Sequence, residues 1–118
     1  MRIRILIASA LLAVLGHGIA HAHAMLDHAS PAVGSSVASA PREVSLTFTQ
    51  NLEASFSSVQ VTDGNGARVD QGKAQINGNI MRVGLKALPA GTYRVRWRAL
   101  STDTHETEGS FTFTVGGR

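Results

Sequence analysis

Two short stretches of the chain carry the side chains best suited to metal chemistry. Asp103 and His105 are two residues apart in the segment 100–109, and this spacing puts both side chains on one side of an extended chain. His23 lies far away in the sequence, within the segment 20–24 (Ala-His-Ala-His-Ala). If the processed chain begins at His23, the three residues supply two imidazoles, one amine and one carboxylate. This donor set favours Cu(II), whereas structural zinc more often uses cysteine.

The first 22 residues have the pattern of a secretory signal peptide. Arg2 and Arg4 give a positive start, an uncharged apolar run covers 5–16, and Ala20 and Ala22 have the small-x-small spacing of a cleavage site. The apolar run is shorter than the roughly 20 residues that a membrane-spanning helix needs. We therefore expect a signal peptide over 1–22 and an exported domain over 23–118.

Two neighbouring cleavage frames stay open, because 18/20 and 22/24 are also pairs of small residues. Cleavage after Ala20 would leave His-Ala-His at the amino end, a chelate of different geometry. Cleavage after Ala24 would start the chain at Met25 and remove His23 altogether. The identity of the first mature residue therefore decides whether this ligand exists.

The composition limits the classes of function. About 96 residues remain after residue 22, which is the size of one small domain with one core. Two of the eleven basic side chains, Arg2 and Arg4, lie in the export segment, which leaves nine against eight acidic ones. This balance gives no support to a nucleic-acid or anionic-membrane role. There is no cysteine, so stability must come from burial without disulfides.

Alternation of apolar and polar residues with a period of two dominates the chain after residue 40 and predicts an all-β domain. The expected strands are centred on residues 44–48, 59–61, 81–85, 93–99 and 111–115, with a weakly patterned segment around 69–76. Turn signals separate them at 63–66, 77–78 and 88–91. About seven short strands in this length predict an immunoglobulin-like β-sandwich with Greek-key connections, with a small closed barrel as the alternative.

The segment 100–109 joins the two most strongly patterned strands and is longer and more polar than a tight turn requires. Taken singly, its residues have ordinary interpretations: His105 as a solvated loop residue and Asp103 as a turn residue. His28 is read as a surface residue that could also complete a metal shell. The arginines at 94, 96 and 98 are read as a solvated strand face, and Trp97 as a core residue.

From residue 23 to 115 the chain resembles the CopC family of periplasmic copper-binding proteins. The resemblance rests on His23 placed eight residues before Pro31, Ser-Pro-Ala-x-Gly-Ser at 30–35, Leu-Thr-Phe at 46–48 followed by Asn-Leu at 51–52, Gly-Thr-Tyr-x-Val-x-Trp-Arg at 91–98, Ser-x-Asp-Thr-His at 101–105, and Gly-Ser-Phe-x-Phe at 109–113. The Trp-Arg to Asp-Thr-His block at fixed spacing is the most specific part.

The resemblance implies a periplasmic protein that binds Cu(II) through the amine and imidazole of His23 and through Asp103 and His105. The resemblance also suggests hand-over to a CopD-like inner-membrane protein. We expect a monomeric carrier for copper homeostasis or resistance, without catalysis. Some members have a methionine-rich Cu(I) loop, but methionine occurs here only at positions 1, 25 and 81. Some members carry a glutamate where this chain has Gln50, so the copper shell is not extended to that position.

Two other classes of function remain as alternatives. A copper-dependent oxidative enzyme of the histidine-brace type also uses an amino-terminal histidine on an immunoglobulin-like core, but its substrate surface needs aromatic platforms. Here the one Trp and the one Tyr both fall in a predicted core strand. A metal-free sandwich used as a structural module needs only the fold.

Overall fold

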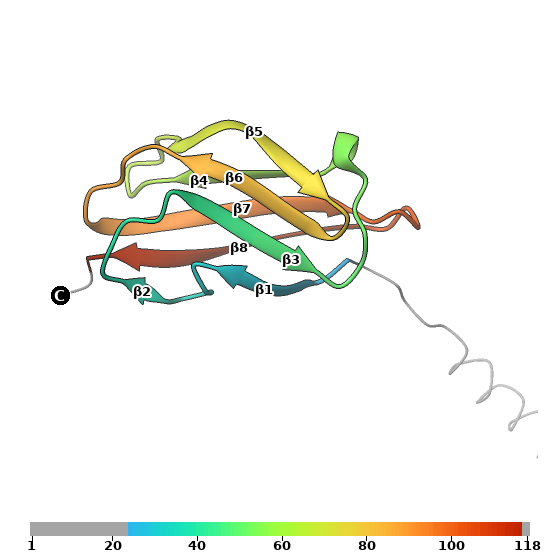
Figure 1. Cartoon of the computed structure of the whole chain (residues 1–118), viewed down its shortest axis with the longest axis horizontal. Helices are drawn as coiled ribbons and strands as arrows, with labels where there is room; N and C mark the ends of the chain where they lie inside the picture. The colour runs from blue at the N-terminus through green and yellow to red at the C-terminus, as the bar shows by residue number, and fades with distance from the viewer. Residues whose placement is uncertain (1–23, 117–118) are drawn as a thin grey trace, which may run out of the picture.

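The computed structural model describes residues 24–116. His23 and the predicted signal peptide lie outside the described residues. Eight strands and one short 3-10 helix make up this part of the chain (Figure 1). The elements are β1 (Leu26–Ser30), β2 (Ser36–Val37), β3 (Glu43–Phe48), η1 (Ala54–Phe56), β4 (Ser58–Thr62), β5 (Asp70–Asn77), β6 (Ile80–Leu85), β7 (Gly91–Leu100) and β8 (Glu106–Val115). None of the helical structure in this region is long and apolar enough to cross a membrane.

The strands form two four-stranded sheets packed face to face. One sheet has the order β1-β3-β6-β5 and the other has the order β2-β8-β7-β4. Neighbouring strands are antiparallel except for the short β2, which pairs in parallel with the end of β8. Non-sequential neighbours such as β3 and β6 mean that the chain crosses between the sheets. The predicted β-sandwich is therefore confirmed, with eight strands instead of about seven.

The core lies between the sheets and is built from the predicted alternation. Every second residue of the central strands is buried: Val44, Leu46, Phe48, Met81, Val83, Leu85, Tyr93, Val95, Trp97, Ala99, Phe111, Phe113 and Val115. Trp97 of β7 contacts Phe48 of β3 edge to face, with ring centroids 5.1 Å apart. This aromatic pair joins the two sheets, so the prediction that Trp97 belongs to the core is confirmed.

The hairpin of β7 and β8 dominates one sheet. Its strands pair over ten residues, from Gly91 opposite Val115 to Leu100 opposite Glu106. The prediction of a long connection over 100–109 is wrong in its extent, because residues 106–109 already belong to β8. Gly109 allows this, since it lies opposite Trp97 where a side chain would meet the indole ring. Only residues 101–105 form the turn.

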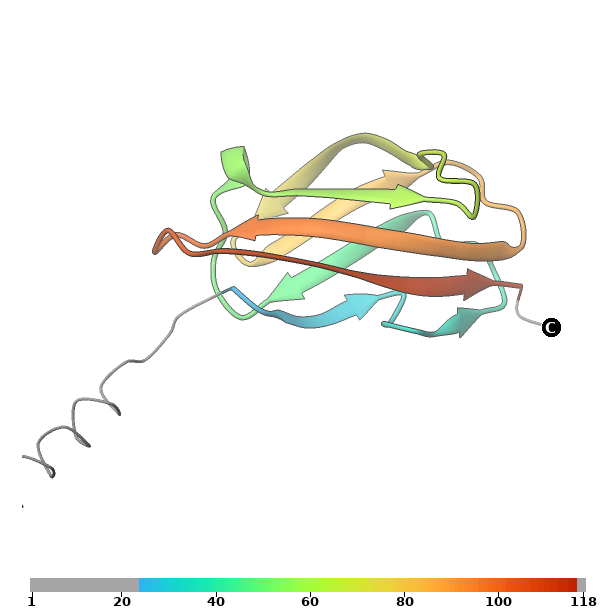
Figure 2. The ribbon, with the colours of Figure 1, turned by 180° about the vertical axis from the view of Figure 1, so that it is seen from behind.

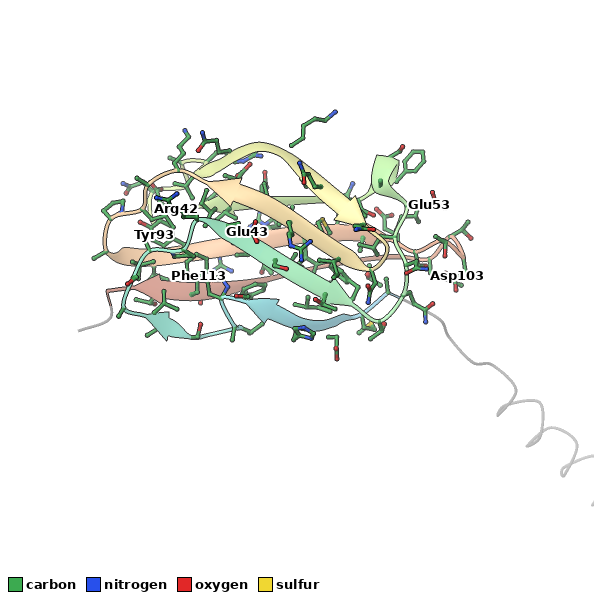
Figure 3. The ribbon with its side chains drawn as sticks, in the orientation of Figure 1. Arg42, Glu43, Glu53, Tyr93, Asp103 and Phe113 are labelled. Atoms are coloured by element: carbon green, nitrogen blue, oxygen red, sulfur yellow. The ribbon has the colours of Figure 1, made fainter. Side chains whose placement is uncertain are left out.

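Two segments that contribute to the candidate site lie at one end of the sandwich. The beginning of β1 and the β7–β8 turn lie at the same end in both views (Figures 1 and 2). Figure 3 places Asp103 and Glu53 at this end, whereas Arg42 and Tyr93 lie at the opposite end. The fold therefore brings together segments that are about eighty residues apart in the sequence.

Candidate metal centre

The β7–β8 turn has a defined backbone conformation. The N–H of Ser101 donates to the carbonyl of His105 at 3.0 Å, and the N–H of Thr104 donates to the carbonyl of Ser101 at 2.8 Å. Thr104 has φ of 70°, in the left-handed region that residues with a side chain seldom adopt. These bonds reverse the chain in five residues and place residues 103 and 105 on the same side of the turn.

The side chains of Asp103 and His105 face each other. Nδ1 of His105 lies 3.4 Å from Oδ1 of Asp103, and the two side chains are 48% and 40% exposed. A carboxylate and an imidazole thus lie together on a solvent-accessible turn. The structure agrees here with the expectation from their spacing of two residues. The contact itself is an ion pair or hydrogen bond and does not require a metal.

The buried side chain of Ser101 is hydrogen-bonded to both residues of this pair. Ser101 is fully buried, with no exposed surface. Its hydroxyl donates to Oδ1 of Asp103 and accepts a hydrogen bond from the N–H of His105 at 3.3 Å. The hydrogen bond from Ser101, with a further contribution from His105, holds the pKa of Asp103 below its ordinary value, although loss of water contact opposes the shift. Asp103 is therefore kept as an anion.

The first described residues are tied to the same end of the fold. The side chain of Thr107 donates a hydrogen bond of 2.6 Å to the carbonyl of Ala24. Ala24 is fully buried, and Met25 exchanges hydrogen bonds with Thr49 at 3.0 and 2.9 Å. Thr107 is only two residues beyond His105, so Ala24 lies close to the candidate turn. His23, the residue before Ala24, lies outside the described residues.

The segment 51–57 is hydrogen-bonded to the base of the turn. The N–H of Thr102 donates to the carbonyl of Asn51 at 3.0 Å, and the N–H of Glu53 donates to the carbonyl of Leu100 at 2.8 Å. Ser57 adds a hydrogen bond of 3.0 Å from the N–H of Leu100 to its hydroxyl. The segment 51–57 therefore holds the base of the turn in place through two backbone hydrogen bonds and the hydroxyl of Ser57.

The other candidates lie apart from this turn. His28 is on the edge strand β1, where its Nδ1 lies 3.0 Å from Oδ2 of Asp27 and both side chains are exposed. Met81 is buried in the core, and Met25 is 56% exposed. Within residues 24–116 no three His, Cys, Asp or Glu side chains are grouped so that they could hold a metal ion. Asp103 and His105 would need at least one donor from elsewhere.

Two residues that support the site, Ser101 and Thr107, are not predicted from the sequence to have a role in it. Ser101 is the first residue of the Ser-x-Asp-Thr-His motif at 101–105, and its fixed place before Asp103 is the signal that could have found it. Thr107 continues the series at 103, 105 and 107. Their residue types alone do not mark them, because serine and threonine hydroxyls are common in turns and usually form local hydrogen bonds.

The described residues thus form a β-sandwich protein that presents a carboxylate and an imidazole on one hairpin turn, beside the start of its first strand. Residues 26–116 match the family model described as the CopC domain. The chain belongs to the CopC family, and the resemblance noted in the sequence is confirmed.

Solved structures agree with this assignment. CopC from Methylosinus trichosporium OB3b is 34% identical, with a TM-score of 0.70 over 79% of this chain and 93% of that one. PcoC from Escherichia coli, described as a methionine-rich copper resistance protein, is 38% identical, with a TM-score of 0.70 over 80% of this chain and 99% of that one. The β-sandwich of this chain is therefore a CopC fold along nearly its whole described length.

Sequence relatives differ in overall length. Copper resistance protein C of Pseudomonas syringae pv. tomato is 35% identical over 111 residues, which cover 86% of this chain and 87% of the relative. The copper transport protein CutJ of Bacillus subtilis is 39% identical over 99 residues, which cover 80% of this chain but only 18% of CutJ. The same domain therefore also occurs as a small part of a much longer protein.

Proposed function

We propose that the mature chain, residues 23–118, is a periplasmic Cu(II)-binding protein whose ligands are His23, Asp103 and His105. The observation that carries the proposal is the hydrogen bond from Thr107 to the carbonyl of Ala24, because it fixes the start of the fold beside the Asp103–His105 pair. The names of the relatives, copper resistance protein C and copper transport protein, support copper as the cargo.

Covalent geometry supports His23 as the third ligand. Consecutive Cα atoms are about 3.8 Å apart across a trans peptide, and two residues span at most about 7 Å of extended chain. Residue 23 directly precedes Ala24, whose carbonyl accepts a hydrogen bond from Thr107, and Thr107 is two residues from His105. A terminal amine and an imidazole at position 23 are therefore within reach of the turn. Cleavage after Ala22 would create that amine.

The donor chemistry favours the cupric ion. Two imidazoles, an amine and a carboxylate are nitrogen and oxygen donors that suit a tetragonal Cu(II) site. Cu(I) prefers thioethers, and of the described methionines only Met25 is exposed while Met81 is buried. We infer that this protein lacks a methionine-rich Cu(I) site, although its relative PcoC is described as methionine-rich.

The role we infer is binding and delivery by a monomer, without catalysis. A chelating terminus and two ligands from one braced turn hold the ion in a nearly complete shell, so copper leaves slowly unless an acceptor supplies replacement ligands. We propose a CopD-like inner-membrane copper protein as that acceptor. The match to a small part of CutJ is consistent with a domain that works beside a larger partner.

The experiment that tests the proposal combines two measurements on the exported protein. Mass spectrometry of the periplasmic form should give His23 as the first residue. Copper titration, in competition with a chelator, should then give one Cu(II) per chain, with affinity greatly weakened in His105→Ala and Asp103→Ala but retained in the matched control His28→Ala. A chain that begins at another residue, or equal affinity in His105→Ala and wild type, would refute the ligand set.

The same material distinguishes the alternatives. A histidine-brace enzyme would oxidise polysaccharide when loaded with copper and supplied with a reductant or peroxide, and we expect no turnover. Both candidate platform residues, Tyr93 and Trp97, are buried, at 3% and 8% exposure. A metal-free structural module would bind no copper above the level of the His105→Ala variant.

A further inference from the structure

A row of arginines on β7 leaves two positive charges without a carboxylate partner. Arg94, Arg96 and Arg98 point away from the core on the outer face of the β2-β8-β7-β4 sheet, since the residues between them are buried. Arg98 is paired with Glu106 at 3.2 Å and with Glu108 at 3.6 Å. No carboxylate of residues 24–116 lies within ion-pair distance of Arg94 or Arg96. The charge of the row is therefore neutralised only at the end nearest the β7–β8 turn.

The side chains on the neighbouring strands also differ between Arg98 and the other two arginines. On β8 the residue opposite Arg98 is Glu108, whereas Ser110 and Thr112 stand opposite Arg96 and Arg94. On β4 the residues opposite Arg96 and Arg94 are Gln60 and Thr62. Nη1 of Arg94 contacts the hydroxyl of Ser110 at 3.4 Å. The residues directly opposite the two unpaired guanidinium groups are thus neutral and can donate hydrogen bonds.

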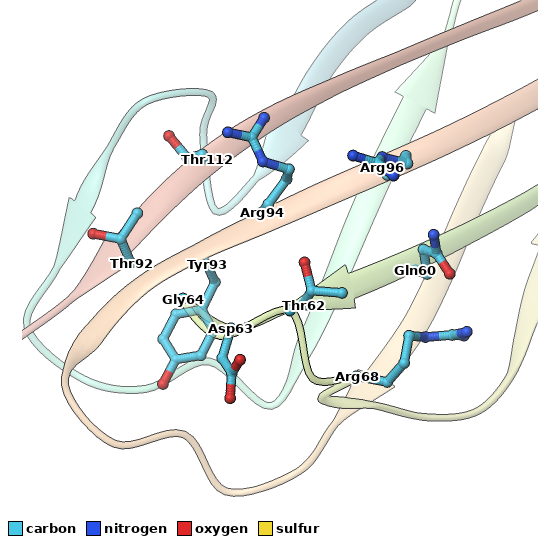
Figure 4. A pocket seen from close by; sticks show the side chains of 11 residues that line it. Gln60, Thr62, Asp63, Gly64, Arg68, Thr92, Tyr93, Arg94, Arg96 and Thr112 are labelled. Atoms are coloured by element: carbon cyan, nitrogen blue, oxygen red, sulfur yellow. The ribbon is translucent and has the colours of Figure 1, made fainter.

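A groove of about 580 Å³ is lined by Arg94 and Arg96 together with Gln60, Thr62 and Thr112 (Figure 4). Figure 4 shows Arg94 and Arg96 rising from β7, with the hydroxyls of Thr62, Thr92 and Thr112 nearby. Among the described residues one carboxylate, that of Asp63, lines the groove.

That carboxylate is already engaged by the backbone. Its Oδ1 accepts hydrogen bonds from the N–H groups of Asn65 and Ala67, at 2.9 and 3.0 Å. Arg68, on the far wall, is held by two hydrogen bonds of 2.7 Å to Asp70. Among the described residues that line the groove, Arg94 and Arg96 are therefore the guanidinium groups without a carboxylate partner.

We propose that this groove binds an oxyanion of the phosphate class, as inorganic phosphate or as a phospholipid headgroup. Arg94 and Arg96 stand about 6.5 Å apart along the strand, so both guanidinium groups can reach one tetrahedral anion. Guanidinium groups form forked, charge-assisted hydrogen bonds with phosphate, and threonine hydroxyls can donate to its remaining oxygens. The site lies on a different surface from the Asp103–His105 turn and does not depend on copper.

The test uses the copper-free mature protein at about 150 mM NaCl, where exposed charges more than about 8 Å apart are largely screened. Inorganic phosphate is titrated while the backbone and arginine Nε–H signals are followed by NMR, with sodium acetate at equal ionic strength as the comparison anion. Binding to vesicles is measured by sedimentation, with phosphatidylglycerol in phosphatidylcholine against phosphatidylcholine alone. The variant is Arg94→Gln/Arg96→Gln, and Arg82→Gln is the matched control, because Arg82 carries the same charge on the other sheet.

We expect phosphate, and not acetate, to shift the signals of Arg94 and Arg96, with affinity about tenfold weaker or lost in the double variant and unchanged in Arg82→Gln. Binding to anionic vesicles without a response to inorganic phosphate, and lost in the double variant, would identify the lipid headgroup as the source. The proposal is overturned if neither probe binds, if acetate acts as phosphate does, or if the double variant binds as well as Arg82→Gln. Should the double variant lose the native Trp97 fluorescence, the single variants carry the same test.

Discussion

The hydroxyl of Thr107 donates a hydrogen bond of 2.6 Å to the carbonyl of Ala24, which joins the start of the fold to β8. The bond spans 83 residues of sequence and lies two residues from His105. It closes one end of the sandwich, because Ala24 is fully buried there. Any ligand supplied by the preceding residue depends on this attachment to be held near the turn.

Replacement of Thr107 should therefore weaken copper binding. Thr107→Val keeps the shape of the side chain but removes the donor, which costs about 1 kcal/mol and lowers Cu(II) affinity about fivefold. Thr107→Ser keeps the hydroxyl and should retain most of the affinity. Competition titration with a chelator measures both variants. Identical affinities in the valine and serine variants would show that the attachment of Ala24 does not matter to the site.

Ser101 offers a test on the copper-free protein. Ser101→Ala removes the donor to Asp103 and the acceptor of the His105 N–H, both at a fully buried position. The pKa of Asp103 should rise toward its ordinary value, because the lost hydrogen bond favoured the charged carboxylate. The free energy of unfolding should fall by about 1–3 kcal/mol. Carboxyl NMR titration and urea unfolding measure the two effects.

Ser57→Ala is the matched control for this variant. Ser57 also supports the turn, by accepting a hydrogen bond from the N–H of Leu100, but it does not contact Asp103. It should lower stability and leave the pKa of Asp103 unchanged. A shift of that pKa in both variants would mean that general loosening of the turn, and not the Ser101 hydroxyl, sets the charge of Asp103.

Copper binding should depend strongly on pH. Ligation needs deprotonated nitrogens, and the free α-amine and imidazole ordinarily titrate near about 8 and 6.5. Protons therefore compete with the cupric ion as the pH falls, and we expect affinity to drop steeply between about pH 6 and 4. Visible absorption of the copper complex over this interval measures the loss. A flat profile would mean that nitrogen donors do not hold the ion.

The sequence predicted the strands in which buried and polar residues alternate, including the edge strand β4, and not the more exposed edge strands. Val44, Leu46 and Phe48 alternate with polar residues because one face of β3 meets the core and the other meets solvent. The strands β1, β2 and β5 are at sheet edges and are mostly exposed or half-buried, so no period-two pattern marks them. In β5 the register also shifts between Gln71 and Gln75, near Gly72 with φ of 79°.

The candidate site likewise contains features that the sequence predicts and features that it does not. The nearness of Asp103 and His105 was predicted from their spacing, but the structure reaches it through the turn at 101–105, with Thr104 at a φ of 70°, and not through an extended chain. The attachment of Ala24 to Thr107 and the burial of Ser101 are long-range and packing effects, and a sequence gives no register between segments eighty residues apart. The participation of His23 stays a prediction, since that residue lies outside the described part of the chain.

Gly109 is required by the packing of Trp97. A Cβ atom at residue 109 would lie 2.7 Å from Cζ2 of Trp97, closer than atoms in contact can approach. Gly109→Ala should displace the indole from its edge-to-face contact with Phe48 and lower the free energy of unfolding by about 1–3 kcal/mol. Trp97 is the one tryptophan of the chain, so its fluorescence reports the displacement directly.

Gly64→Ala serves as the control for that substitution. A Cβ at residue 64 meets nothing within 4 Å, so its effect should stay within about 0.5 kcal/mol. Native fluorescence and stability in Gly109→Ala would contradict the packing argument, because the indole would then have room for the added methyl group.

Acid should weaken the fold through Asp70. Its side chain is 5% exposed and accepts two hydrogen bonds of 2.7 Å from Arg68, as well as one from the N–H of Val61. The hydrogen bonds from Arg68 hold the pKa of Asp70 below its ordinary value of about 3.9, against the opposing effect of burial. A lowered pKa in the folded state stabilises the protein above about pH 4, and this contribution is lost as the pH falls through the folded-state pKa. Because Arg68 is more than half exposed, we expect about 1 kcal/mol.

Urea unfolding at pH 7 and at pH 2.5 measures this contribution. Asp70→Asn retains an acceptor for Val61 but not the charge, so it should be less stable than wild type at pH 7 and should lose less stability on acidification. Arg68→Gln should behave in the same way, and the double variant should be little worse than either single one, since both remove one interaction. Additive losses in the double variant would mean that the two side chains stabilise the β4–β5 connection independently of each other.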